Sequence, residues 1–101
     1  MADAWVYMLR CSDGSLYTGW SIDVERRLSR HQAGTASRYT ASRRPVELVY
    51  ARAMEDRGAA MREEARIKRL ERPGKLALIA SEGVPEGLGK AQSGVTGGVA
   101  A

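Results

Sequence analysis

Two tyrosines lie in short apolar segments near the start of the sequence, and a phenol can hold or move a proton. Tyr7 stands in the run 5–11, which is rich in strand-forming residues. Tyr17 stands in a similar run, 16–20, after a Ser-Asp-Gly-Ser segment typical of a tight turn. The two runs therefore predict a β-hairpin whose tyrosine rings can approach each other. Core packing is the competing interpretation, because tyrosine is common in strands.

Arg27 and His31 are four residues apart, and this spacing places them on one face of a helix predicted for residues 24–32. At about 100° per residue, the same face carries the apolar side chains of Val24 and Leu28. A charge beside the core is costly unless it has a partner or a task. Both residues are therefore candidates for binding or catalysis. A structural alternative stays open, in which Arg27 pairs with an acid and His31 stabilises the carboxyl end of the helix.

A second long helix, predicted for residues 56–70, carries adjacent carboxylates at Glu63 and Glu64. A carboxylate is a suitable hard ligand for Mg²⁺ or Mn²⁺, which retain several waters and need few protein ligands. Helical geometry does not choose between the two glutamates, although Glu63 lies slightly nearer the apolar stripe of the helix. A surface ion pair with a neighbouring basic residue is the alternative role for either one.

Basic residues outnumber acidic ones, and the formal net charge is +4. Most of the basic residues are arginines, whose planar guanidinium binds phosphate through two parallel hydrogen bonds. The segment 26–44 has no acidic residue and contains Arg26, Arg27, Arg30, Arg38, Arg43 and Arg44. Within it, Arg26 and Arg30 face away from the apolar stripe of the first helix. A basic surface of this kind indicates a nucleic-acid partner. An Arg-rich composition that merely reflects a GC-rich genome is the alternative.

The elements that would position these residues follow one another in the order β-β-α-β-α. A third strand is predicted over 46–51, and a last short helix over 75–80, after an interruption at Pro73 and Gly74. This order predicts an α+β fold with a small three-stranded, mainly antiparallel sheet flanked by helices.

The sequence is less decisive about where the first helix begins and where the domain ends. Ser21 or Asp23 caps the first helix, and the sequence does not decide between them. Residues 35–44 are polar and basic and predict a loop with at most one helical turn. The domain is expected to span residues 1–80, because Gly, Ser, Ala and Val dominate from residue 81 onwards. We expect residues 81–101 to form a disordered tail.

Composition excludes several classes of protein. No run approaches the roughly 18 apolar residues of a membrane helix, and the first residues lack the pattern of a secretory signal. Cys11 is the single cysteine, so it cannot form an internal disulfide, and a reducing compartment is indicated. With one cysteine and one histidine, a zinc site built by this chain alone is not expected. We therefore expect a cytoplasmic protein with no membrane partner.

Several short motifs occur in one order along the chain. They are Val6-Tyr7-Met8, Leu16-Tyr17-Thr18-Gly19, Asp23-x-x-Arg26-Arg27, His31-x-x-Gly34, Tyr39-Thr40, Arg43-x-Pro45 and Arg62-x-Glu64-x-x-Ile67-Lys68-x-Leu70. This series resembles the GIY-YIG nuclease superfamily, and more narrowly its short single-domain bacterial members. The resemblance covers about residues 4–80, and order, spacing and predicted secondary structure agree along that length.

The resemblance implies a metal-dependent endonuclease, and it assigns a role to each candidate. Tyr7 and Tyr17 correspond to the tyrosines of the two name-giving triplets, and either one could be the general base. Arg27 matches the catalytic arginine of the family, and His31 matches the position four residues later. Glu64 rather than Glu63 matches the metal-binding glutamate, which implies Mg²⁺ or Mn²⁺ as the cofactor. DNA repair or processing is the implied setting.

Nucleic acid is the implied partner, with DNA expected first and RNA not excluded. The residues expected to contact it surround the catalytic candidates: Arg26, Arg30, Arg38, Tyr39, Arg43, Arg44 and Lys68. Several nucleases of this fold have an appended DNA-binding domain, which this chain lacks, so we also expect a protein partner that supplies substrate specificity.

Two alternatives to a nuclease remain open. The first is a nucleic-acid binding module that keeps the fold but cuts little or not at all. It is favoured because the DNA-binding domain that several members carry is not expected here, and because the chain contains no Asn, which several members carry late in the domain. The second is a protein-interaction domain whose basic face binds an acidic partner. It predicts no salt-sensitive affinity for DNA, whereas phosphate contacts predict a steep fall of affinity with salt.

Overall fold

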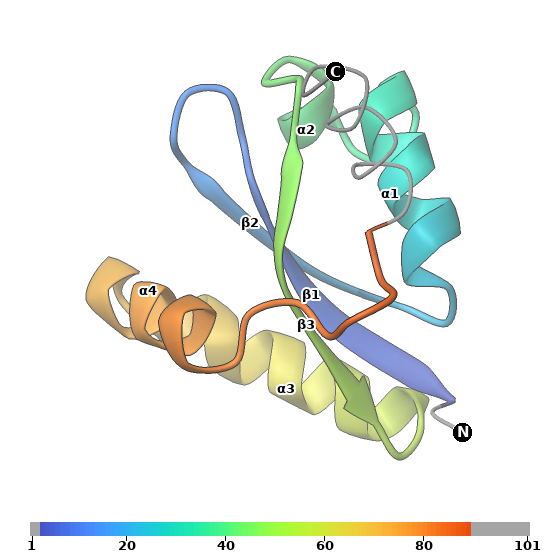
Figure 1. The fold of residues 1–101 in the computed structure, drawn as a ribbon, viewed down its shortest axis with the longest axis vertical. Coiled ribbons are helices and arrows are strands. Elements are labelled where there is room, and N and C mark those ends of the chain that lie inside the picture. The colour runs from blue at the N-terminus through green and yellow to red at the C-terminus, as the bar shows by residue number, and fades with distance from the viewer. Residues whose placement is uncertain (1–2, 90–101) are drawn as a thin grey trace.

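The computed structural model describes residues 3–89, in which strands and helices follow the order β-β-α-α-β-α-α (Figure 1). The strands are β1 (Ala4–Arg10), β2 (Leu16–Ser21) and β3 (Glu47–Met54). The helices are α1 (Val24–Ala33), α2 (Arg38–Ala41), α3 (Arg57–Arg69) and α4 (Arg72–Ser81). The predicted α+β class is confirmed, and α2 is the single helical turn expected in the basic loop.

The strand β1 lies at the centre of a sheet that has the order β2-β1-β3. It pairs antiparallel with both neighbours, so the sheet is three-stranded and antiparallel within the described residues, as predicted. In the register of the hairpin, Tyr7 is opposite Gly19 and Leu9 is opposite Tyr17. Opposed residues of antiparallel strands point to the same face, so the two tyrosines share one face of the sheet.

The turn between β1 and β2 is held by its own side chains. Gly14 has φ +84°, a left-handed conformation that glycine adopts without strain. The carboxylate of Asp13 accepts hydrogen bonds from the backbone N–H of Ser15 at 3.0 Å and from its hydroxyl at 2.6 Å. This Asx-type geometry fixes the hairpin register, which in turn places the tyrosines.

Helices cover both faces of the sheet, with α1 and α2 on one side and α3 and α4 on the other (Figure 1). Tyr7 and Leu9 belong to a buried cluster with Leu28 of α1. Met8 points to the opposite face and belongs to a second cluster with Ile67 of α3. The period-two alternation of β1 thus divides the core between its two faces. Because α3 contacts both β1 and β2, its flank lies near the edge strand β2.

The beginning of α1 is capped by Asp23, whose carboxylate accepts from the backbone N–H of Arg26 at 3.1 Å. The hydroxyl of Ser21 is used in the preceding turn, where it bonds the backbone of Asp23. This answers the question that the sequence left open. The helix ends at Gly34, which has φ +82° and donates to the carbonyls of the last turn, as a left-handed cap does.

The last helix differs from the sequence-based expectation. Pro73 and Gly74 do not interrupt the chain between two helices but lie in the first turn of α4, which extends from Arg72 to Ser81. Proline is tolerated there, since the first N–H groups of a helix have no intrahelical acceptor. The expected helix over 75–80 is therefore longer at its beginning.

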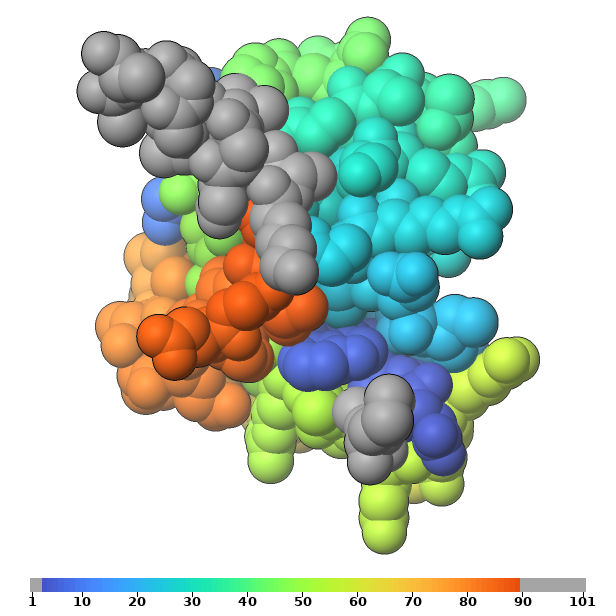
Figure 2. All heavy atoms as spheres, turned by 45° about the vertical axis from the view of Figure 1, so that its right-hand side comes forward, coloured from blue at the N-terminus to red at the C-terminus, as the bar shows by residue number. Residues whose placement is uncertain are grey.

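The boundary expected at residue 81 is also corrected. Val84 and Leu88 pack against the cluster formed by the α1 face of the sheet, and the backbone carbonyl of Gly83 accepts from Ala51 N–H at 3.1 Å. Figure 2 shows this red-orange segment lying against α1 and the start of β1. Residues 82–89 thus belong to the packed domain, since burial of the apolar side chains of Val84 and Leu88 stabilises their position. The rest of the expected tail, residues 90–101, lies outside the described residues.

Candidate active site

A buried polar relay joins the centre of the sheet to α1 and α2. The hydroxyl of Tyr7 lies 2.8 Å from Nε2 of His31, and Nδ1 of His31 lies 2.8 Å from the hydroxyl of Thr40. Thr40 in turn lies 2.9 Å from the hydroxyl of Ser37, the residue that caps α2. Tyr7, His31 and Thr40 are almost completely buried. Both ring nitrogens of His31 thus have partners, which a buried polar group requires.

Burial keeps both Tyr7 and His31 uncharged in their hydrogen-bonded pair. Burial, with the nearby Arg27 charge as a second cause, lowers the pKa of His31 to about 4. Burial raises the pKa of Tyr7 above its ordinary range, and the neighbouring Tyr17 adds to this rise. Arg27 opposes the rise in the pKa of Tyr7, while the carboxylate of Glu64 increases it slightly. At neutral pH, a protonated phenol therefore faces an uncharged imidazole.

Tyr17 lies beside the relay and is less buried than Tyr7. Its ring centroid is 5.1 Å from that of His31 and 6.5 Å from that of Tyr7. On its other side it stacks against Tyr39, with the centroids 6.0 Å apart. The sequence predicted that Tyr7 and Tyr17 approach each other, and the sheet register brings them to this distance.

Gly19 owes its place in the Tyr-Thr-Gly motif to a close approach. A Cβ atom at this position would lie 2.7 Å from the hydroxyl oxygen of Tyr7, closer than real contacts allow. The absence of a side chain at Gly19 thus lets Tyr7 reach His31 across the paired strand.

Arg27 lies half-buried on α1, on the same side as His31, as its spacing predicted. It borders two adjoining hollows, with volumes of about 250 and 310 Å³. Arg26 and Arg30 line the first; both are exposed, as their position opposite the apolar stripe predicted, and both adjoin Arg27. Arg57, at the beginning of α3, lines the second. Sequence reasoning missed Arg57, because no local pattern indicates that the start of α3 borders the same hollow as Arg27.

The structure distinguishes the two adjacent glutamates of α3. Glu63 is engaged in ion pairs, at 2.6 Å with Arg66 and at 3.7 Å with Arg52 of β3, and these cations lower its pKa. Glu64 points elsewhere. It is 22% exposed, lies 3.5 Å from the ammonium of Lys68, and is close enough to Tyr7 for its charge to act on the phenol. Within the described chain, Glu64 thus has one ion-pair partner, against two for Glu63, and of these two only the charge of Glu64 acts on Tyr7.

A divalent cation at Glu64 would depend on few protein ligands. Among residues 3–89, no three His, Cys, Asp or Glu side chains come together in a group that could hold a metal ion. Mg²⁺ is commonly bound by one or two carboxylates together with waters and substrate phosphates. A single, partly exposed carboxylate such as Glu64 fits that donor set, and it does not fit a structural zinc site.

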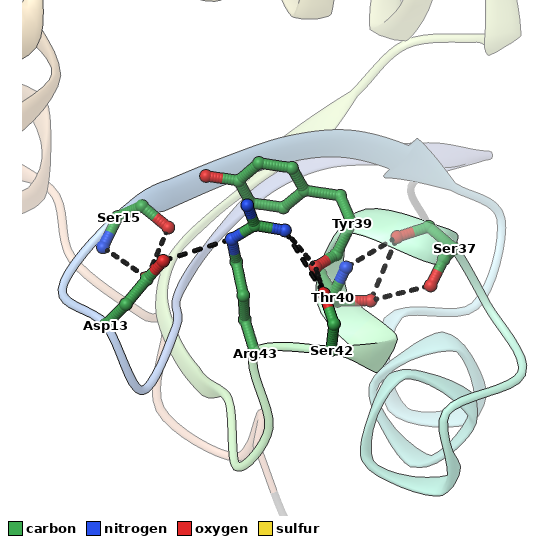
Figure 3. Close-up of polar contacts among 7 residues, drawn as sticks. All are labelled: Asp13, Ser15, Ser37, Tyr39, Thr40, Ser42 and Arg43. Carbon is green, nitrogen blue, oxygen red and sulfur yellow. Dashed lines mark hydrogen bonds and ion pairs between the residues drawn. The ribbon is translucent and has the colours of Figure 1, made fainter.

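Several of the outer basic and aromatic candidates have partners within the domain. The guanidinium of Arg43 stacks over the ring of Tyr39 at 3.9 Å and binds the carboxylate of Asp13 at 3.0 Å (Figure 3). Arg44 donates to the carbonyl of Ala41 at 2.9 Å and to that of Gln32 at 3.3 Å, so it holds the loop after α2. Arg38 is exposed at the start of α2, and Lys68 is the partner of Glu64.

The helices of the described chain are all too short or too polar to cross a membrane. This agrees with the absence of a long apolar run in the sequence.

Fold and site together define a small catalytic-type domain with a tyrosine-bearing hairpin. Residues 3–77 match the family model of the GIY-YIG catalytic domain, so the chain belongs to the GIY-YIG family, a family of nuclease domains. This confirms the resemblance seen in the motifs.

Within that family, the chain is similar to the UPF0213 proteins. It is 47% identical over 81 residues to the UPF0213 protein of Natronomonas pharaonis, which covers 80% of this chain and 95% of the relative. It is 49% identical over 76 residues to that of Streptococcus sanguinis, covering 75% and 87%. The solution NMR structure of the UPF0213 protein BH0048 from Bacillus halodurans has 41% identity, covers 81% and 87% of the two chains, and superposes with a TM-score of 0.54. The names of these relatives state no reaction.

Proposed function

We propose that this protein is a metal-dependent endonuclease that hydrolyses phosphodiester bonds in nucleic acid, with DNA as the first candidate and DNA repair or processing as its setting. One observation carries the proposal. The ring of Tyr17 packs beside the buried pair of Tyr7 and His31, and the charges of Arg27 and Glu64 both act on Tyr7. Phenol, guanidinium and carboxylate are thus gathered at one place, as phosphodiester hydrolysis requires.

Arg27 is the group that would hold the phosphate. Its guanidinium can donate two parallel hydrogen bonds to nonbridging oxygens, and it lies at the edge of hollows that also expose Arg26 and Arg57. These cations would bind the neighbouring phosphates and draw the strand across the site. The half-buried position of Arg27 strengthens its interaction with an anion, because water screens it less.

Tyr17 is better placed than Tyr7 to accept a proton from the attacking water. Tyr7 is almost completely buried, its hydroxyl is used by His31, and its raised pKa opposes deprotonation. Tyr17 is partly exposed and lies between the relay and the rim. We therefore assign Tyr7 and His31 to positioning and assign Tyr17 to the role of general base or water-orienting group.

Glu64 would hold the cation, with waters and the substrate phosphate as its other ligands. A bound Mg²⁺ or Mn²⁺ supplies neutralisation of the phosphate charge and stabilisation of the leaving oxygen. The ammonium of Lys68 lies 3.5 Å from the carboxylate of Glu64.

The decisive experiment measures cleavage of labelled branched, nicked and single-stranded substrates with Mg²⁺, Mn²⁺ or EDTA. We expect cleavage that needs the metal and that falls by about 10²–10³-fold in Arg27→Ala and in Glu64→Gln. Glu63→Gln is the matched control, since it makes the same charge change one residue away and its partners are Arg66 and Arg52. Parent-level cleavage by Glu64→Gln would show that the assignment is wrong.

A binding module that cuts little or not at all is the second candidate, because Arg26, Arg27 and Arg30 line one hollow and can bind phosphates without a base or a metal. It predicts salt-sensitive binding by the parent without metal-dependent cleavage. A protein partner that brings specificity is compatible with either function, and the cleavage assay with and without cell extract would detect it.

A further inference from the structure

A hollow beside the candidate active site has walls that suit a flat heterocycle. It has a volume of about 240 Å³ and lies where β2, α2, α3 and α4 meet. Its lining residues are Leu16, Tyr17, Thr18, Tyr39, Lys68 and Lys75, and we call it the Tyr39 hollow. It is smaller than the roughly 300–1,000 Å³ pockets that hold drug-sized ligands, so one ring system fits it better than two.

Two aromatic rings and an aliphatic side chain give the hollow an apolar, flat character. Tyr39 is 38% exposed, and its ring is stacked on that of Tyr17. Leu16, the first residue of β2, is half-buried. Aromatic side chains beside a basic surface commonly contact the bases of unpaired strands, by a ring face or by a ring edge.

The ring of Tyr39 is held in place. One of its faces is covered by the guanidinium of Arg43, which also donates to the backbone carbonyl of Tyr39 at 2.9 Å and to the carboxylate of Asp13 (Figure 3). Tyr39 is thus clamped between the hairpin turn and the loop after α2. A clamped ring loses little freedom when it receives a ligand, which favours binding.

The charges at the mouth of the hollow suit a phosphate. Lys75 has no ion-pair partner among residues 3–89, and Lys68 is only loosely paired, at 3.5 Å, with Glu64. Because Lys68 also neighbours the proposed metal ligand, a nucleotide in the hollow would have its phosphate next to the reacting one. An apolar, aromatic wall with two ammonium groups at its edge therefore matches a nucleobase that is still attached to its strand.

A buried hydroxyl in the wall offers a group for the edge of a base. Thr18 is only 4% exposed, and its Oγ1 has no hydrogen-bond partner within the described chain. Buried hydroxyls are normally bonded, so an unbonded one indicates a missing partner. Thr18 also lines the hollow, so its hydroxyl is a candidate donor to, or acceptor from, the edge of a bound base.

We propose that the Tyr39 hollow binds one unpaired nucleobase of the substrate strand, next to the phosphate held at the active site. This inference rests on the proposed action on nucleic acid and adds a base-binding subsite to it. A base within a duplex cannot enter a lateral hollow without leaving its stack, so the subsite selects nucleotides that are single-stranded or extruded. Phosphate contacts alone would not distinguish a strand with bases from one without them.

The test compares two short oligonucleotides of equal length and charge, a thymidine oligonucleotide and its abasic tetrahydrofuran counterpart. Binding is measured by fluorescence anisotropy in EDTA, so no cleavage is needed. We expect the parent to bind the thymidine strand about tenfold more tightly than the abasic strand. Tyr39→Ala should bind both strands equally, and Tyr39→Phe should keep the preference. Lys75→Ala should weaken binding of both strands alike, and Met61→Ala, an exposed site on α3, should change nothing.

Backbone ¹⁵N–¹H spectra provide an independent readout of position. The thymidine strand should shift the amides of Leu16, Thr18 and Tyr39, and the abasic strand should leave them nearly unchanged. The spectra also show whether Tyr39→Ala remains folded.

The outcomes separate this inference from the proposed nuclease activity. Equal binding of the two strands by the parent, or a preference that survives Tyr39→Ala, overturns the base subsite even if metal-dependent cleavage is observed. A preference that Tyr39→Ala abolishes supports the subsite even if the protein proves unable to cut. Failure to bind either strand at low salt overturns both proposals.

Discussion

Tyr7 and His31 form a buried hydrogen bond of 2.8 Å that joins the central strand of the sheet to α1. The bond exists because Gly19 leaves space for the phenol and because Thr40 satisfies the second ring nitrogen. Both groups are neutral at physiological pH, since burial raises the pKa of Tyr7 and lowers that of His31. We therefore give the buried pair a positioning role and assign the proposed catalytic steps to groups nearer the solvent.

Replacing Tyr7 by phenylalanine tests this positioning role. Tyr7→Phe removes the hydroxyl and leaves Nε2 of His31 buried without a partner, so the free energy of unfolding should fall by about 1–3 kcal/mol. Tyr17→Phe should change it by less than about 0.5 kcal/mol, because the Tyr17 hydroxyl bonds no other residue in the described range and its side chain is only partly buried. Urea denaturation of both variants at pH 7 gives the comparison. Equal losses would mean that the buried bond contributes no net stability.

In a cleavage assay we expect the reverse ranking, with the larger loss in Tyr17→Phe and the smaller loss in Tyr7→Phe. If Tyr17 is the base or the group that orients the water, Tyr17→Phe lowers kcat by about 10²–10⁴-fold. Tyr7→Phe should lower it less, in proportion to the disorder it brings to His31. Single-turnover cleavage at saturating Mg²⁺ measures the chemical step. A larger loss in Tyr7→Phe than in Tyr17→Phe would return the role of base to the buried tyrosine.

Stability should also depend on pH through His31. Its pKa is about 6.5 when unfolded and about 4 in the fold, so the unfolded chain binds the extra proton first as pH falls. The stabilisation is complete above about pH 6.5 and is lost progressively towards pH 4. Since one pH unit between the two pKa values corresponds to about 1.4 kcal/mol, the total is on the order of 3 kcal/mol.

The measurement is the free energy of unfolding in urea at several pH values between 7 and 4. His31→Gln is the control, since it cannot titrate and the amide still offers a donor and an acceptor. It should be less stable than the parent at pH 7 and show a flatter pH dependence above pH 5. Parallel curves for the two proteins would assign the acid sensitivity to carboxylates, such as Glu63, whose pKa is lowered by Arg66.

The sequence predicted those parts of the fold and site that depend on local geometry. The hairpin followed from the Asp-Gly turn between two strand-like runs, and the shared face of Arg27 and His31 followed from their spacing. The resemblance to the family selected Glu64 over Glu63, a choice that helix geometry left open. The ion pairs of Glu63 now provide a physical reason for that choice.

What the sequence could not predict depends on contacts between distant segments. Thr40 closes the relay only because α2 folds back onto α1, and its local sequence gives no sign of a partner nine residues earlier. Arg57 reaches the hollow of Arg27 because α3 begins near the end of β2. Helical spacing gives the direction of Arg26 on α1, but it does not show that an exposed arginine adjoins a hollow.

The last prediction concerns Gly19, whose missing side chain leaves space for the phenol of Tyr7 and so for its bond to His31. Gly19→Ala places a methyl group 2.7 Å from the Tyr7 oxygen and 3.2 Å from a ring carbon of Tyr17, and the side chain of Tyr7 is almost completely buried. Tyr7 cannot retreat, so its bond to His31 must lengthen or β2 must move. We expect a loss of about 1–3 kcal/mol in unfolding free energy, together with a fall in cleavage as Tyr17 is displaced. Gly58→Ala is the matched control. In α3 the added methyl meets the flexible end of Arg62 at 3.2 Å and the carboxylate of Asp56 at an ordinary 3.4 Å, and alanine favours the helix by up to about 1 kcal/mol. Thermal denaturation should therefore show Gly19→Ala to be less stable than the parent and Gly58→Ala to be more stable. In cleavage assays, only Gly19→Ala should lose activity. If Gly19→Ala were as stable and active as Gly58→Ala, the close contact between strand and phenol would not be what requires glycine in the Tyr-Thr-Gly motif.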